Sequence, residues 1–347
     1  MQHPTARRAS VLASLIWLAS LPALSVGPGA AQTSAHALRF HGTGVGPPGQ
    51  QDRILLPVDD NQPGTGGNTP IDVGDGDFTI EWWMRGRLED NQSTGLGGDV
   101  ESFDYSWIDG NILLDRDVWC GTARAFGVSI RGGRVAFGTD TGDGGGDFSN
   151  TIEGSELVLD DTWHHVAVVR DASDGRKRIY VDGQLDFTSS PTSFEDLSYP
   201  DAGVPVTGNC GTGQLTPYGW YLVVAAEKHD AGPAYPSYAG YFDELRLWST
   251  ARSASQIAQT WDRLVEPSSP GLVGMYRLEE GSGVVVSDGS VAGSPDGDLR
   301  AGVAGNGEWV SAAVDPANTA PIVGLVDLIF ADGFEAGDLA AWSASTP

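Results

Sequence analysis

Residues 162–187 constrain the fold of this chain more than any other stretch. Their first part alternates between two sides with the two-residue period of an extended strand, and few of them are charged, so both faces are expected to be covered. A turn-forming loop at 171–177 separates this strand from a second one, which ends at Asp182-Gly183. An Asp-Gly pair between apolar runs favours a type I′ turn, because both central residues need positive φ. The stretch therefore predicts a three-stranded antiparallel meander.

Other segments have the same period. In 77–85 one side carries Phe78, Ile80, Trp82 and Met84, which we expect to face a core, and the other side carries Thr79, Glu81, Trp83 and Arg85. Further strands are expected at residues 37–40, 53–57, 111–114, 125–130, 134–138, 219–226, 239–248, 271–278 and 308–310. The apolar residues of 239–248 do not all share one side, which predicts a bulge or two covered faces.

One segment has a clear helix signal. Ser253 and Gln256 form a capping box, and Ile257, Trp261 and Leu264 follow as an apolar face. A single short helix among so many strands leaves the expected class all-β.

The first 31 residues have the pattern of a secretory signal peptide. Arg7 and Arg8 precede an apolar run, and small residues follow before Gln32. A retained N-terminal anchor is the alternative, which Pro22 and Pro28 disfavour. No later segment reaches the roughly 18 apolar residues of a membrane-spanning helix. We therefore expect a protein without a transmembrane segment that is secreted, to the extracellular space or the cell surface.

The charge balance excludes some partners. The sequence has 46 acidic and 20 basic residues, a formal net charge of −26. Without a basic patch such a chain does not attract nucleic acid or anionic lipid. Cys120 and Cys210 are the two cysteines. Because the signal peptide directs them to an oxidising compartment and neither has CxxC spacing, we expect them to form a disulfide.

Five motifs follow one another along the chain: Phe78-Thr-Ile-Glu-Trp-Trp-Met-Arg, Trp163-His-His-Val-Ala-Val-Val-Arg, Ile179-Tyr-Val-Asp-Gly-Gln, Tyr241-Phe-Asp-Glu-Leu-Arg-Leu-Trp-Ser and Gly271-Leu-Val-Gly-Met-Tyr-Arg-Leu-Glu-Glu-Gly-Ser-Gly. Together they resemble a laminin-G-like (LamG-like) jelly-roll domain of the concanavalin A-like lectin/glucanase group. The resemblance covers residues 37–314 and implies a two-sheet antiparallel jelly-roll sandwich, in a domain that we place at 32–314. Such domains include glycan-binding, adhesion and protein-binding modules and some enzymes, so the fold alone does not decide the function.

Catalytic patterns are missing from the sequence. The chain has no run of alternating carboxylates as in glycosidases of related fold, no GxSxG and no HExxH. His164 and His165 are expected to pack and form hydrogen bonds. We therefore expect a non-enzymatic binding or adhesion module that recognises a polysaccharide or a cell-surface or extracellular protein. The alternatives are a polysaccharide-degrading glycoside hydrolase or lyase, and a structural envelope protein without a small ligand.

Trp83 is the candidate ligand-binding aromatic, with Glu81 and Arg85 on the same side. The alternative is that loops or the short helix cover Trp83. The resemblance further implies a structural Ca²⁺ site at Asp243. Aspartates next to glycines elsewhere are expected to be solvated turn formers rather than ion ligands.

The end of the chain is predicted to be separate from the domain. Residues 315–327 are rich in Pro, Ala and Asn at their start and are predicted to be a linker. Residues 328–347 resemble a short tail of exported bacterial proteins. We expect this tail to act as a detachable surface or sorting tag, or to form an extra strand.

Overall fold

The structure, a computed structural model, describes residues 34–42, 52–60, 68–103, 106–117, 125–140, 149–199, 220–228, 235–300 and 307–324. All of these residues belong to one compact unit, Ala31–Pro347. The predicted signal peptide, both cysteines and the predicted C-terminal tail lie outside the described residues, so they stay predictions.

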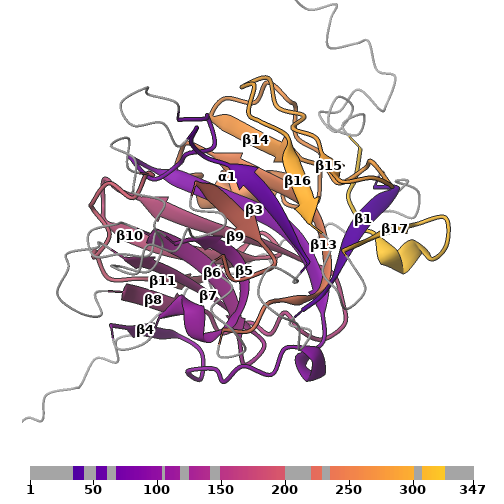
Figure 1. The fold of residues 1–347 in the computed structure, drawn as a ribbon. Helices are drawn as coiled ribbons and strands as arrows, with labels where there is room; N and C mark the ends of the chain where they lie inside the picture. The colour runs from indigo at the N-terminus through magenta and orange to yellow at the C-terminus, as the bar shows by residue number, and fades with distance from the viewer. Residues whose placement is uncertain are drawn as a thin grey trace, which may run out of the picture. The chain divides into compact units, whose positions relative to one another are not determined.

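The described strands form two antiparallel sheets (Figure 1). The first sheet has the order β11 (Gln184–Thr188), β10 (Arg176–Val181), β9 (His164–Asp171), β3 (Phe78–Gly86), β13 (Ala239–Trp248), β1 (His36–His41) and β17 (Glu308–Ser311), with β14 (Leu272–Tyr276) paired to β13. The second has the order β15 (Val285–Val286), β16 (Gly297–Arg300), β2 (Arg53–Pro57), β12 (Tyr221–Val224), β5 (Asn111–Arg116), β6 (Ala125–Arg131), β7 (Arg134–Asp140), β8 (Ser149–Glu153) and β4 (Val100–Ser102). This is the predicted all-β jelly-roll sandwich.

The core lies between the sheets, and β3 shows how the sequence builds it. The four alternate residues predicted to face the core all belong to the main hydrophobic cluster: Phe78, Ile80, Trp82 and Met84. Trp83 belongs to a different cluster. We call the side of the first sheet that faces away from the core its outer face.

The predicted meander is confirmed by β9, β10 and β11, which pair antiparallel in this order. Its tight turn has Asp182 at φ 48° and Gly183 at φ 76°. Both residues therefore lie in the left-handed region that a type I′ turn requires.

The predicted irregularity in β13 is a bulge. The register with β3 shifts between Asp243 and Arg246, and Glu244 has φ 47°. The bulge returns Leu245 and Leu247 to the core. It leaves Tyr241 and Asp243 on the outer face before the bulge, and Arg246 after it.

The helix begins where the capping box predicts. Ser253 accepts a hydrogen bond from the Gln256 backbone N–H, and the Gln256 side chain accepts one from the Ser253 backbone N–H at the start of α1 (Ala254–Thr260). Ile257 of α1 packs on the outer face, against Ala167, Val169 and Tyr180. In the part of the chain that the structure describes, no helix is long and apolar enough to cross a membrane.

A tryptophan that no sequence pattern identified packs on the outer side of the second sheet. Trp107, in the 3₁₀ turn η2 (Trp107–Asp109), is 2% exposed. Its ring lies over Gly127 of β6 and Gly138 of β7, which are directly opposite each other. A β-carbon at Gly138 would lie 2.1 Å from Trp107 Cδ1, so this contact requires glycine.

We expect Gly138→Ala to destabilise the protein by about 2 kcal/mol or more, because the added methyl overpacks a closed contact. Gly76→Ala is the matched control, since a β-carbon there meets nothing within 4 Å. Urea denaturation measures both variants. Equal unfolding free energies for the two would contradict the packing of Trp107.

Candidate functional site

One part of the outer face lies under Trp261, Leu264, Ala320 and Ile322, which we call the cover. Trp83 is 1% exposed and packs against Leu264, Ala320 and Ile322, and its ring centroid lies 5.7 Å from that of Trp261. A sugar would have to displace these residues to stack on Trp83. The structure thus agrees with the alternative prediction, in which the short helix and nearby residues cover Trp83.

Glu81 lies under the same cover, fully buried. Arg252 Nη1 contacts its carboxylate, and Arg246 Nη1 lies 3.6 Å from Oε2. Burial by itself raises the pKa of Glu81, but the nearby His165 ring and the charges of Arg252 and Arg246 outweigh it and lower this pKa to about 2. Glu81 is therefore an ionised partner of two buried arginines and is inaccessible to a ligand in this structure.

The start of the predicted linker is part of this cover. Val323 pairs with Arg263, and Ala320 and Ile322 are buried in the cluster around Trp83. Residues 315–323 thus pack on the domain, beginning with the 3₁₀ turn η3 (Pro316–Asn318).

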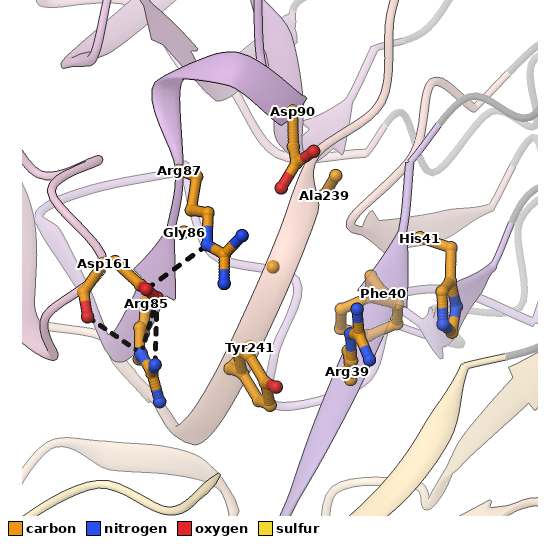
Figure 2. A pocket seen from close by; sticks show the side chains of 11 residues that line it. Arg39, Phe40, His41, Arg85, Gly86, Arg87, Asp90, Asp161, Ala239 and Tyr241 are labelled. Atoms are coloured by element: carbon orange, nitrogen blue, oxygen red, sulfur yellow. Dashed lines mark hydrogen bonds and ion pairs between the residues drawn. The ribbon is translucent and has the colours of Figure 1, made fainter. Parts of the chain in front are cut away.

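Beyond this cover the outer face is open. Arg39 of β1 is opposite Tyr241 of β13, and Tyr241 is opposite Arg85 of β3. The three side chains lie in a row across neighbouring strands (Figure 2). The guanidinium carbons of Arg39 and Arg85 lie 5.6 and 5.2 Å from the Tyr241 ring centroid, within cation–π range. Trp163 meets the same ring edge-on at 6.1 Å.

This row lines a cavity of about 320 Å³. We call it the arginine pocket. The residues that line it are Arg39, Phe40, His41, Arg85, Gly86, Arg87, Asp90, Asp161, Ala239, Gly240 and Tyr241. Its lining is mainly charged and polar, more so than in most small-ligand sites, with the Tyr241 ring among the charged groups.

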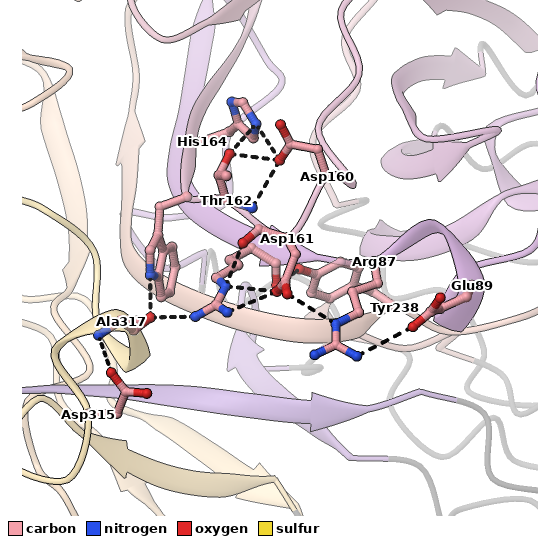
Figure 3. Close-up of polar contacts among 11 residues, drawn as sticks. Arg87, Glu89, Asp160, Asp161, Thr162, His164, Tyr238, Asp315 and Ala317 are labelled. Carbon is pink, nitrogen blue, oxygen red and sulfur yellow. Dashed lines mark hydrogen bonds and ion pairs between the residues drawn. The ribbon is translucent and has the colours of Figure 1, made fainter.

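Asp161 organises one wall of the pocket (Figure 3). Its backbone has φ 66°, a left-handed conformation that Asp tolerates. Its Oδ1 lies 2.9 Å from Arg85 Nη2, and its Oδ2 accepts a hydrogen bond from Arg87 Nε at 3.2 Å. Arg85 Nη1 also donates to the Ala317 carbonyl at 2.7 Å. The two arginines are thus held in fixed positions.

The turn that carries Asp161 is itself held by His164. His164 Nδ1 lies 2.8 Å from Asp182 Oδ2, and Nε2 lies 3.2 Å from Asp160 Oδ1. The hydrogen bond to Asp182 raises the pKa of His164, burial opposes this, and Asp160 adds to the rise. His165 is buried beside Trp83, and burial lowers its pKa. His164 packs and forms hydrogen bonds as predicted, and it supports the pocket wall. His165 packs as predicted, but its ring nitrogens form no hydrogen bond with the described residues, and its Nε2 lies 3.8 Å from Glu81 Oε2.

Asp243 lies on the outer face, fully buried. Its Oδ2 accepts hydrogen bonds from the Ser34 hydroxyl at 2.7 Å and the Ala320 N–H at 3.1 Å, while Oδ1 has no partner among the described residues. Burial raises the pKa of Asp243 well above its usual value, and the charges of Glu244 and Glu279 add to this. No three His, Cys, Asp or Glu side chains come together as metal ligands in the described ranges.

Of the three predicted ligand-binding residues, the structure places Arg85 alone in the pocket. Sequence reasoning missed its companions Arg39, Arg87, Asp161 and Tyr241, which come from segments far apart in the chain. The one local signal was Asp160-Asp161-Thr162, because paired Asp residues favour turns with left-handed backbone.

Comparisons with known proteins place this fold. A family model for the concanavalin A-like lectin/glucanases superfamily matches residues 60–258. The rat (Rattus norvegicus) sushi, von Willebrand factor type A, EGF and pentraxin domain-containing protein 1 is 27% identical over 119 residues, which is 33% of this chain but only 3% of that protein.

Two solved structures are also similar. A putative carbohydrate binding protein from Bacteroides ovatus is 16% identical, with 80% of this chain and 60% of that chain covered and a TM-score of 0.47. A heptameric SAP-like pentraxin from Limulus polyphemus is 12% identical, with 78% of this chain and 97% of that chain covered and a TM-score of 0.43.

We expect Glu81→Gln to lower the free energy of unfolding by about 3 kcal/mol, because it removes the carboxylate that pairs with buried Arg252 and leaves buried Arg246 with Glu244 alone. Glu308→Gln is the control, since Glu308 is 45% exposed and its ion pair lies at the surface, where a change of less than about 0.5 kcal/mol is usual. Urea denaturation compares the two variants.

Folding lowers the pKa of Glu81 from 4.5 to about 2. The stability it contributes is therefore present above its unfolded pKa and is lost as the pH falls through the folded one. The difference in unfolding free energy between the wild-type protein and Glu81→Gln should therefore become smaller as the pH falls. A deficit no larger than that of Glu308→Gln at neutral pH would contradict the structural role.

Proposed function

The chain belongs to the concanavalin A-like lectin/glucanases superfamily, and on this basis we propose that it is an exported, non-enzymatic module that binds a saccharide in the arginine pocket. The observation that carries the proposal is the row Arg39–Tyr241–Arg85, which lines a cavity on the open part of the outer face. Guanidinium groups donate hydrogen bonds to sugar oxygens, and an aromatic ring offers an apolar surface to sugar C–H groups.

The pocket is organised before any ligand arrives. Asp161 holds Arg85 and Arg87, and the Ala317 carbonyl holds Arg85 a second time. A binding site whose side chains are already fixed loses less conformational entropy when the ligand binds. Such a site can bind a small group without a large interface.

The carboxylates of the pocket favour binding without cleavage. Both oxygens of Asp161 are engaged by arginines, so this carboxylate is already occupied by partners within the protein. Asp90 is the other carboxylate of the lining. Glycoside hydrolysis needs two carboxyl groups with divided roles, and one of the two in this lining, Asp161, is bound to arginines.

We also propose a structural Ca²⁺ ion at Asp243. A buried carboxylate oxygen without a partner, close to the charges of Glu244 and Glu279, suits a cation. Asp243 and the Ser34 hydroxyl would hold the ion together with backbone or water oxygens, since Ca²⁺ takes about six to eight oxygen ligands. There it would stabilise the junction between the N-terminal strand and the cover.

Saccharide binding is tested by calorimetric titration of the mature protein against a panel of neutral and acidic oligosaccharides. For the saccharide that binds, we expect Arg87→Ala to weaken affinity by about 10-fold or more, because a hydrogen bond to a charged donor is lost.

Arg300→Ala is the control for that titration. Arg300 is 56% exposed and ion-paired, much as Arg87 is 54% exposed and ion-paired, but it lies in β16 of the other sheet. Equal affinities for the two variants, or no binding to any member of the panel, would rule out the pocket as a saccharide site.

The calcium proposal predicts that chelator lowers the Tm of the mature protein. At a Ca²⁺ concentration of about 100 times Kd the gain is about 3 kcal/mol, or a Tm shift of about 5 °C or more. Asp243→Asn should remove the response to Ca²⁺. A wild-type Tm that is the same in Ca²⁺ and in chelator would contradict the site.

A further inference from the structure

The three arginines of the pocket differ in how far their donors are used. Arg85 donates from Nε to both the backbone and the side chain of Asp161, and its Nη groups contact Ala317 O and Asp161 Oδ1. Its side chain is 17% exposed. Arg85 therefore has little capacity left for a ligand and acts as part of the wall.

Arg87 and Arg39 are different. Arg87 is 54% exposed and uses Nε for Asp161 and Nη1, at 3.4 Å, for Glu89. Its Nη2 has no partner among the described residues. Arg39 is 45% exposed and its ion pair is a single contact of 3.5 Å from Nη1 to Glu308. Both guanidinium groups thus keep N–H donors for a ligand. Arg87 and Arg39 lie on opposite sides of Tyr241 (Figure 2).

From this arrangement we infer that the pocket binds an anionic group of an acidic polysaccharide, a carboxylate or a sulfate ester, through Arg39 and Arg87. This inference rests on the proposed saccharide function and names its ligand class. A planar guanidinium matches two oxygens of such a group, and charge-assisted bonds of this kind are about twice as strong as neutral ones.

Glu308 competes with the ligand for Arg39, and the comparison of strengths favours the ligand. A surface ion pair of this length contributes about 0 to 1 kcal/mol. A paired, two-oxygen contact with the same guanidinium exceeds that value. The ligand anion therefore displaces Glu308 at small cost.

The charge of the whole chain does not prevent this binding. The net charge is −26, and the three arginines of the pocket face Asp90 and Asp161 of the lining and Glu89 and Glu308 beside it, so direct bonds to Arg39 and Arg87, and not a local positive field, hold the anion. At physiological ionic strength charges are screened beyond about 8 Å. Contacts within the pocket thus decide the affinity, and the distant acidic residues do not.

A matched pair of ligands tests the inference: an oligosaccharide of a uronic-acid polysaccharide, and the same oligosaccharide after reduction of its carboxyl groups to alcohols. A sulfated neutral oligosaccharide forms a third arm. We expect the acidic form, or the sulfated one, to bind at least about 10-fold more tightly than the carboxyl-reduced form. Calorimetry at physiological salt measures all three.

Single substitutions test which residues cause the preference for the charged ligand. Arg39→Gln and Arg87→Gln should each remove most of the preference for the charged ligand, and Arg300→Gln should leave it unchanged. Glu308→Gln should increase affinity for the charged ligand by up to about 5-fold, because it frees Arg39 from its competitor. A merely structural role of these residues would not produce a gain in affinity.

The outcomes separate this inference from the proposed function. Equal binding of acidic and reduced oligosaccharides, both weakened by Arg87→Gln, overturns the anionic ligand and leaves the saccharide site standing. Preference for the acidic form that survives both arginine substitutions places the anion elsewhere and overturns the inference. No binding in any arm overturns both.

Discussion

The buried charge cluster of Glu81, Arg246 and Arg252 is the constraint on which the outer face of the first sheet depends. Ionised groups removed from water are costly unless they meet partners, and here one carboxylate contacts two guanidinium groups. Arg252 comes from the segment after β13, and its backbone N–H donates to the Thr79 hydroxyl at 2.9 Å. The cluster therefore fixes the covering segment to β3 and β13.

The cover ends at a defined place. The Ala317 carbonyl accepts hydrogen bonds from both Arg85 Nη1 and Trp163 Nε1, at 2.7 and 2.9 Å. On one side of this carbonyl Trp83 is buried, and on the other side Tyr241 lines the arginine pocket. Alternate residues of a single strand thus have different roles: Glu81 and Trp83 hold the cover, while Arg85 forms the wall of a pocket.

Local patterns predicted the fold well. Alternation in β3, the Asp182-Gly183 turn and the Ser253 capping box each depend on neighbouring residues, and the structure confirms all three. The candidate site could not be predicted in the same way. Arg39, Tyr241 and Arg85 meet through the pairing of β1, β13 and β3, and a single sequence does not show which strands are neighbours.

The same limit applies to Trp83. Its position on the polar side of β3 was correctly predicted, but its cover comes from residues about 180 and 240 positions later, Trp261 and Ala320. Long-range packing of this kind has no periodic signal. Turns are easier to recognise in the sequence than long-range packing. Asp161, whose backbone is left-handed and whose side chain orients Arg85 and Arg87, lies in an Asp-Asp-Thr segment that favours a turn.

We propose that the open part of the outer face binds the ligand and that the covered part supports it. Nitrogen-edited NMR of the arginine and tryptophan side chains, during titration with an acidic oligosaccharide, distinguishes the two parts. We predict that the signals of Arg39, Arg87 and Trp163 shift with ligand concentration while the indole signal of Trp83 stays in place. Shifts centred on Trp83, or confined to residues of the second sheet, would contradict the claim.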